Sequence, residues 1–182
     1  MKANRPQLDK ALKSPAATRL FLLHGPDEAG SMALARKVGG ALGAEAERIS
    51  LTGSELKGDP ARLADEAASL SMFGGARWVL VTPAGDETLD AVAALLDAPA
   101  AGNPVVLVAG ALRATSKLLK LVTAAPNALA FASYPPDARD FARLAGELAR
   151  AKGLMLDADD ARRLVEACGA NRAILEQELD KL

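Results

Sequence analysis

Two glycines lie where a short apolar run gives way to a predicted helix. Residues 19–24 form the apolar run, and residues 25–32 follow with the sequence Gly-Pro-Asp-Glu-Ala-Gly-Ser-Met. Gly25 and Gly30 have the spacing of the glycines in the phosphate-binding loop G-x-x-x-x-G-K-[ST], and they lie in the strand-to-helix turn where such a loop occurs. This context predicts a nucleotide-binding scaffold, although two ordinary turn glycines would give the same spacing.

The groups that carry out phosphate chemistry are missing from this loop. Ser31 occupies the position of the lysine that meets the β- and γ-phosphates, and Met32 occupies the position of the hydroxyl that holds Mg²⁺. Asp27 and Glu28 add negative charge where a triphosphate would lie. The predicted strand over residues 77–82 is followed by proline instead of an acidic Mg²⁺ ligand. We therefore expect a degenerate loop that binds no nucleotide, with no catalytic residue, metal or cofactor.

Other reactive residue types occur singly or in small groups. His24 ends the first apolar run without a serine or aspartate partner pattern, so we interpret it as a structural polar residue. Cys168, the single cysteine, can form neither an internal disulfide nor a zinc site and is expected in a helical core. A basic cluster consists of Arg113, Lys117 and Lys120. We interpret it as a solvated helix face; the alternative is a contact with DNA or a neighbouring subunit.

Strands and helices are expected to alternate through the first two thirds of the chain. Apolar runs predict strands over residues 19–24, 47–51, 77–82, 104–109 and 129–133. Helices are predicted over residues 29–42, 86–97 and 115–125. A further helix is predicted to begin at residue 59 and to end at a corner formed by residues 72–75, and residues 53–58 are predicted to be a loop. Asp59, Asp86 and Thr115 are the predicted N-caps. This alternation predicts an α/β fold with a parallel sheet covered by helices on both faces.

The alternation ends near residue 135. A helix is expected over residues 137–152, and Asp157 and Asn171 are predicted to cap two more. We therefore expect two domains, residues 1–135 and residues 136–182, the second a small three-helix domain. The last helix carries no stop signal, so we expect the chain to be a fragment of a longer protein.

Residues 69–75, Ser-Leu-Ser-Met-Phe-Gly-Gly, place two large apolar side chains at a corner between a helix and a strand. Connections run over the surface and are usually polar. The Met-Phe pair therefore either packs under the fold or contacts a partner. Leu63, Ala67 and Leu70 fall at i, i+4 and i+7, which predicts an apolar helix stripe before the corner.

Three stretches of the chain carry a resemblance to a known family. They are Phe-Leu-Leu-His-Gly-Pro-Asp-Glu at 21–28, Asp-Pro-Ala-Arg-Leu-Ala-Asp-Glu-Ala at 59–67, and Ser-Leu-Ser-Met-Phe-Gly-Gly at 69–75. Together they resemble the delta subunit of the bacterial DNA polymerase III clamp loader, and residues 137–182 are similar to its second domain. The resemblance implies an AAA+-like domain without ATPase function, a helical lid domain, and a C-terminal collar that this sequence lacks.

The resemblance also implies a site and partners. Leu70, Met72 and Phe73 would bind the sliding clamp (the beta subunit), because residues 69–73 are similar to the clamp-binding pentapeptide Gln-Leu-Ser-Leu-Phe. Ser69 replaces its glutamine, and Met72 replaces its second leucine. Such a subunit helps to open the ring for loading onto DNA during replication. ATPase subunits and delta-prime would be further partners, and DNA would be contacted only indirectly. No intrinsic activity is expected within this nucleotidyltransferase holoenzyme.

Three alternatives remain open. A P-loop ATPase or nucleotide kinase would need other residues at positions 31 and 32. A delta-prime or ATPase subunit of the loader would carry a four-cysteine zinc module, and this chain has one cysteine. An AAA+-like scaffold with an unrelated partner is distinguished only by a binding experiment.

Composition excludes further classes of protein. The chain has 182 residues and a formal net charge of −1, so unaided nucleic-acid binding through a basic stripe is not expected. Residues 1–14 are charged and contain no apolar core of a signal peptide. The longest apolar run, around residues 105–112, is too short to span a membrane. We expect a soluble cytoplasmic protein.

Overall fold

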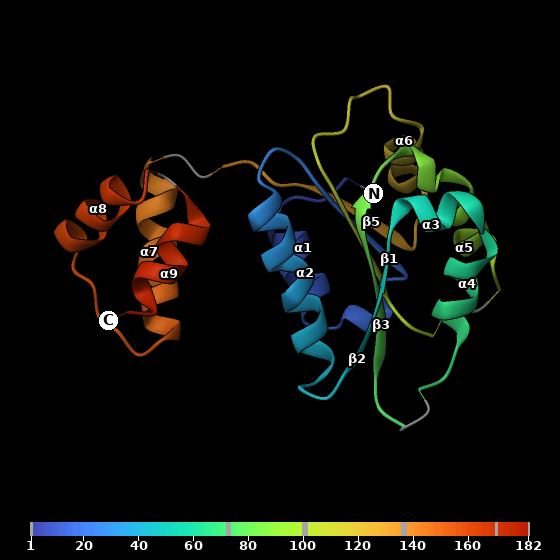
Figure 1. The fold of residues 1–182 in the computed structure, drawn as a ribbon, viewed down its shortest axis with the longest axis horizontal. Helices are drawn as coiled ribbons and strands as arrows, with labels where there is room; N and C mark the ends of the chain where they lie inside the picture. The colour runs from blue at the N-terminus through green and yellow to red at the C-terminus, as the bar shows by residue number, and fades with distance from the viewer. Residues whose placement is uncertain (1, 72–73, 100–101, 136–137, 170, 182) are drawn as a thin grey trace. The chain divides into compact units, whose positions relative to one another are not determined.

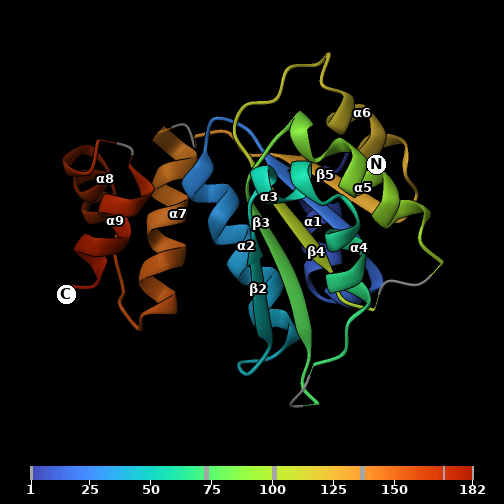
Figure 2. The ribbon, with the colours of Figure 1, turned by 45° about the vertical axis from the view of Figure 1, so that its right-hand side comes forward.

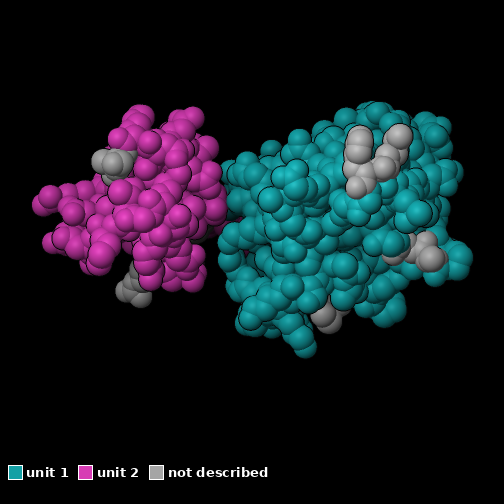
Figure 3. Space-filling view, turned by 90° about the horizontal axis from the view of Figure 1, so that it is seen from below, with its two compact units in different colours: residues 1–133 teal, residues 134–182 magenta. Residues whose placement is uncertain are grey.

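The computed structural model describes residues 2–71, 74–99, 102–135, 138–169 and 171–181. The chain forms two compact units, residues 1–133 (unit 1) and residues 134–182 (unit 2), shown in Figure 3. Each unit has its own buried core, so the two are described separately.

Unit 1 is built on a five-stranded parallel sheet, which confirms the predicted α/β class. The strands are β1 (Leu20–His24), β2 (Glu47–Leu51), β3 (Arg77–Ala84), β4 (Val105–Ala109) and β5 (Ala128–Ala132). Their order in the sheet is β2-β3-β4-β1-β5, and every neighbouring pair is parallel. All residues of β1 and β4 are buried, as expected for central strands covered on both faces. The prediction that Pro83 ends β3 is wrong, because the strand continues to Ala84 with a shift of register after Val81.

Helices cover both faces of the sheet (Figures 1 and 2). They are α1 (Arg5–Leu12), α2 (Glu28–Leu42), α3 (Gly53–Gly58), α4 (Ala61–Ala68), α5 (Leu89–Asp97) and α6 (Lys117–Ala124), with short 3₁₀ turns η1 (Pro15–Ala17) and η2 (Asp86–Thr88). The alternation of side chains along β1 separates two cores. Leu20 and Leu22 join the core under α3 to α6, whereas Phe21 and Leu23 join the core under α1 and α2.

Residues 53–58 form α3, so the loop predicted there is wrong. The Thr52 hydroxyl accepts a hydrogen bond from the Glu55 amide (3.3 Å), and the Glu55 carboxylate accepts one from the Thr52 amide (2.7 Å). This reciprocal pair is a capping box, which satisfies two donors at the start of a helix. The Thr-x-x-Glu spacing indicates the start of this helix in the sequence. Gly53 and Gly58, at the two ends of the segment, instead favour a loop.

The next helix is shorter than predicted at both ends. Asp59 does not cap it, because its amide donates to the Glu55 carbonyl and ends α3. Pro60 precedes α4 without a side-chain cap, and the helix ends at Ala68 instead of reaching the corner at 72–75. Leu63 is fully buried, whereas Leu70 lies beyond the helix and is 91% exposed. The predicted apolar stripe therefore ends before Leu70.

Asp86 caps a different helix from the one predicted. Its carboxylate accepts hydrogen bonds from the Ser116 hydroxyl (2.5 Å) and the Leu118 amide (3.0 Å), so it binds the start of α6. Ser116, not Thr115, is the N-cap of α6, because its hydroxyl accepts from the Leu119 amide (3.1 Å). The Ser116 hydroxyl and then the Leu118 amide lower the pKa of the Asp86 carboxyl below its ordinary value.

An Asp86→Ala variant is expected to lose about 0.5–1 kcal/mol of unfolding free energy at pH 7, because α6 loses a cap. A carboxyl with a depressed pKa in the folded state contributes stability above its unfolded pKa of about 4, and that stability is lost as pH falls through the folded pKa. The difference between wild type and variant should therefore shrink below about pH 4. Urea unfolding at several pH values measures this, with Asp97→Ala, an exposed carboxylate on α5, as the control. An equal loss at pH 7 and pH 2 would contradict the assignment.

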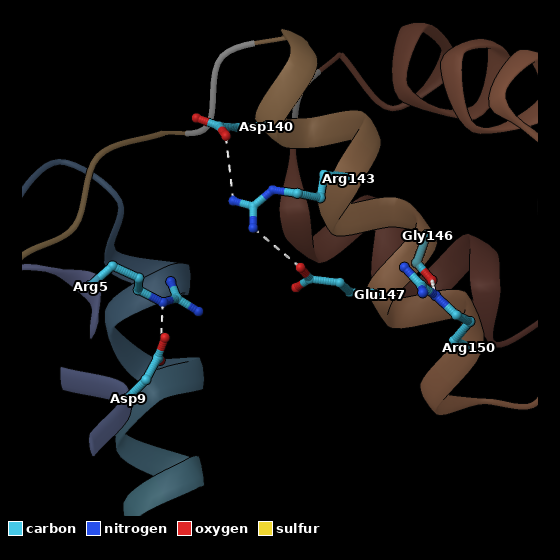
Figure 4. A network of polar contacts seen from close by, with 7 residues as sticks. All are labelled: Arg5, Asp9, Asp140, Arg143, Gly146, Glu147 and Arg150. Atoms are coloured by element: carbon cyan, nitrogen blue, oxygen red, sulfur yellow. Dashed lines mark hydrogen bonds and ion pairs between the residues drawn. The ribbon is translucent and has the colours of Figure 1, made fainter. Parts of the chain in front are cut away.

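Unit 2 contains three helices, α7 (Ala138–Ala151), α8 (Ala158–Ala167) and α9 (Arg172–Leu179). The predicted caps are confirmed: the Asp157 side chain accepts from the Asp160 amide, and the Asn171 side chain accepts from the Ala173 and Ile174 amides. Figure 4 shows Arg143 of α7 paired with Asp140 and Glu147, each at 3.4 Å. The buried core consists of Phe141, Ala145, Ala149, Ala161, Val165, Cys168, Leu175 and Leu179. Burial also raises the pKa of the Cys168 thiol, which fits the expected core role.

Candidate functional site

The degenerate phosphate loop is fixed to the ends of three strands. Gly25 follows β1 with φ of +130°, and a Cβ at this position would lie 2.1 Å from the carbonyl oxygen of Ser133. Its amide donates to the carbonyl of Gly110 after β4 (3.1 Å), and the Asp27 amide donates to the Ser133 carbonyl after β5 (3.3 Å). Glycine is therefore required here for close packing of backbone, independently of any phosphate.

A carboxylate of the chain itself occupies the amino-terminal end of α2. Asp27 accepts a hydrogen bond from the Gly30 amide at 2.8 Å, and its carbonyl accepts from the Ser31 amide at 3.0 Å. A Cβ at Gly30 would lie 2.0 Å from the second Asp27 carboxylate oxygen. Helix amino termini bind phosphates through these same free amides. Here the Gly30 amide, which a phosphate loop would direct at its ligand, is paired with the Asp27 carboxylate.

The other predicted residues of this loop lie inside the fold. Ser31 is fully buried, and its hydroxyl has no hydrogen-bond partner among the described residues. Met32 packs against the core under α1 and α2. His24 is also buried, and burial, with a smaller contribution from Lys2, lowers the pKa of its imidazole. None of these side chains is presented to a ligand at the loop, and no group of three possible metal-binding side chains occurs within the described ranges.

The second predicted site is the corner at residues 69–75. Met72 and Phe73 lie outside the described residues. Leu70, on the α4 side of the corner, is 91% exposed. On the β3 side, the Gly74 amide donates to the Ser71 carbonyl at 3.2 Å, and Gly74 has φ of +74°. Among the described residues of the corner, Leu70 therefore presents a large apolar side chain to solvent.

Side chains that sequence reasoning missed hold the base of this corner. Asn103, from the connection between α5 and β4, donates its side-chain amide to the Ser69 carbonyl at 2.6 Å. Arg77, the first residue of β3, forms an ion pair with Glu66 of α4 at 2.9 Å and lies 3.6 Å from a carboxylate oxygen of Glu47. Asn103 and Arg77 are 34 and 11 residues away from their partners in the chain, so no local pattern signals them.

The described residues of the two predicted sites lie at opposite edges of the sheet (Figure 1). Residues 25–32 follow the carboxyl end of β1, whereas residues 69–75 precede the amino end of β3. Because all five strands are parallel, these ends face opposite directions. The basic cluster of Arg113, Lys117 and Lys120 is exposed at the carboxyl edge, in and before α6. Within the described ranges, we find no helix with the length and hydropathy of a membrane span.

The chain matches no family model and no curated protein sequence. It does match solved structures. The Bacillus subtilis DNA clamp loader delta protein YqeN aligns with a TM-score of 0.65 and 15% identity over 96% of this chain and 56% of its own. The Thermotoga maritima RuvB R170A variant aligns with a TM-score of 0.59 and 17% identity over 97% of this chain and 59% of its own.

A further Thermotoga maritima structure, the RuvB Holliday junction branch migration motor, aligns with a TM-score of 0.57 and 15% identity over 97% of this chain and 61% of its own. The chain thus spans less than two thirds of the length of each of these structures. At such identities the likeness shows the fold, which is AAA+-like.

Proposed function

We propose that this chain is a clamp-loader subunit of the delta type, which binds the sliding clamp through Leu70, Met72 and Phe73 and helps to open the ring. The observation that carries the proposal is the exposure of Leu70, 91%, on a corner fixed at its base. Burial of an exposed apolar side chain by a partner contributes to the binding free energy, and a segment that is already ordered at its base loses less conformational freedom on binding. The resemblance of residues 69–73 to a clamp-binding pentapeptide and the likeness of the fold to a clamp loader delta protein both support this role.

The proposal includes a set of partners. Besides the clamp, these are the ATPase subunits and delta-prime of the loader, with DNA contacted indirectly within the complex in the cytoplasm. As a non-catalytic member of the polymerase holoenzyme, the subunit would bind and position the clamp and would catalyse no reaction itself.

The test is binding of the chain to the sliding clamp of the same organism, measured by surface plasmon resonance with the clamp immobilised. Saturable binding that a peptide of residues 66–78 competes for would support the proposal. A folded chain that does not bind the clamp would contradict it and leave an AAA+-like scaffold with another partner.

ATP with Mg²⁺ is expected to give no saturable binding to this chain. The Asp27 carboxylate occupies the Gly30 amide, and Ser31 and Met32 provide neither an ammonium group nor an exposed hydroxyl. Isothermal titration calorimetry measures this directly, with an ATPase subunit of a clamp loader as the positive control. Binding at micromolar ATP would instead favour the alternative of a P-loop ATPase or nucleotide kinase.

A further inference from the structure

The carboxyl end of α4 is closed by a residue from a distant connection. The side-chain Nδ2 of Asn103 donates to the carbonyl oxygens of Ser69 (2.6 Å) and Glu66 (3.4 Å), and its backbone amide donates to the Ala67 carbonyl (3.0 Å). The last carbonyls of a helix have no partners within the helix. Asn103 therefore supplies donors to two of them, those of Glu66 and Ala67, and to the carbonyl of Ser69, where the chain leaves α4 for the corner.

The other end of the corner is held at the same place. Arg77 begins β3, and its side chain, only 12% exposed, pairs with the Glu66 carboxylate at 2.9 Å. Ion pairs shielded from solvent are screened less than exposed ones. Glu66 thus contacts both Asn103 and Arg77, so the entry and the exit of residues 69–75 are tied to one residue of α4.

We propose that Asn103 is a positioning residue for the clamp-binding corner. It fixes the direction in which the chain leaves Ser69, and Leu70 is the next residue. This inference rests on the proposed function. A binding segment already held in one conformation loses less conformational freedom when it binds, so the same contacts give tighter binding. The folded chain should therefore bind the clamp more tightly than a free peptide of residues 66–78 does.

Asn103→Asp tests this with almost no change of size. A carbonyl oxygen only accepts hydrogen bonds, so the asparagine must present its NH₂ group to Ser69 and Glu66. An aspartate has no donor there and places negative charge beside the two oxygens. We expect the affinity of the variant for the clamp to be about 5- to 30-fold lower than that of wild type, because two hydrogen bonds are lost. This loss should remove most of the difference in affinity between the folded chain and the free peptide.

Asn127→Asp is the matched control. Asn127 precedes β5 at the same edge of the sheet and makes no side-chain hydrogen bond among those found in the described part of the chain, while the charge change is identical. Its clamp affinity should equal that of wild type. Asn103→Ala, which removes the donor without adding charge, replaces the aspartate variant if that variant does not fold.

Hydrogen exchange separates failure of this inference from failure of the proposed function. The Ser69 and Gly74 amides, bonded to Asp65 and Ser71 carbonyls, should exchange at least about tenfold faster in the Asn103 variant, while amides of β1 and β4 are unchanged. Unchanged exchange at Ser69 and Gly74 overturns the inference, whether or not the clamp binds. Wild-type clamp affinity in the variant also overturns it. No clamp binding by wild type defeats the proposed function, and exchange alone then decides whether Asn103 positions the corner.

Discussion

A Met72→Ala/Phe73→Ala double variant is expected to bind the sliding clamp about 30- to 1,000-fold more weakly than wild type. Burial of a methionine or phenylalanine side chain in an apolar pocket contributes about 1.5–3 kcal/mol. Truncation of two such anchors should therefore cost at least about 2–4 kcal/mol of binding free energy. Surface plasmon resonance against immobilised clamp measures the change, which should lie mainly in the dissociation rate.

Two single variants sharpen this experiment. Leu70→Ala removes the exposed leucine of the same segment and should weaken binding by a smaller factor. Met155→Ala removes a methionine that is 96% exposed in unit 2, outside the proposed site, and should leave the affinity unchanged. Circular dichroism confirms that each variant is folded. If the double variant binds as tightly as wild type, the site lies elsewhere on the chain, even if the clamp is the partner.

Phe141→Ala is expected to unfold unit 2 while unit 1 stays folded. Phe141 is fully buried and is the largest side chain in the core of α7, α8 and α9. Phenylalanine-to-alanine changes in cores cost about 3–5 kcal/mol. A core of this size rarely supplies more than about 3–5 kcal/mol in total, since unit 2 comprises only residues 134–182. The variant therefore loses about as much stability as unit 2 has.

Limited proteolysis followed by mass spectrometry is the measurement of choice here, because it locates the unfolded region. Cleavage should appear throughout residues 138–181, with a protected fragment that contains the sheet. Tyr134→Ala is the control, because it truncates an aromatic side chain that is 71% exposed and should change stability by less than about 0.5 kcal/mol. Protection of α7 to α9 in the Phe141 variant would show that unit 2 is stabilised by more than its own core.

The strands and the three carboxyl-terminal helices were predictable because the signals for them are local. The apolar runs over β1 and β4 and the caps Asp157 and Asn171 each depend on a few adjacent residues. The predictions of helix caps were wrong where a side chain forms its hydrogen bonds with an element far away in the sequence. Asp86 looks like a cap for the helix that follows it, yet its carboxylate binds the start of α6, 30 residues away.

At the candidate site too, the features signalled by adjacent residues were predicted, whereas those that depend on distant contacts were not. Sequence pattern indicated the corner at residues 69–75 and the loss of the phosphate-binding lysine. It also placed Leu70 on the buried stripe of a helix, because i, i+4, i+7 spacing does not reveal that α4 ends at Ala68. Asn103 could not be predicted, since its role depends on tertiary contacts with the carboxyl end of α4.

The Asp27 carboxylate has a consequence for attempts to restore nucleotide binding. It behaves as an intramolecular ligand of the Gly30 amide in α2, because only two residues lie between Asp27 and Gly30 and the carboxylate accepts from that amide at 2.8 Å. A group tethered so closely is present at an effective concentration of about millimolar or more, and any free anion must compete with it. Introducing lysine and threonine at positions 31 and 32 would therefore leave an occupied helix terminus. Removal of the competing carboxylate is the change that has to come first.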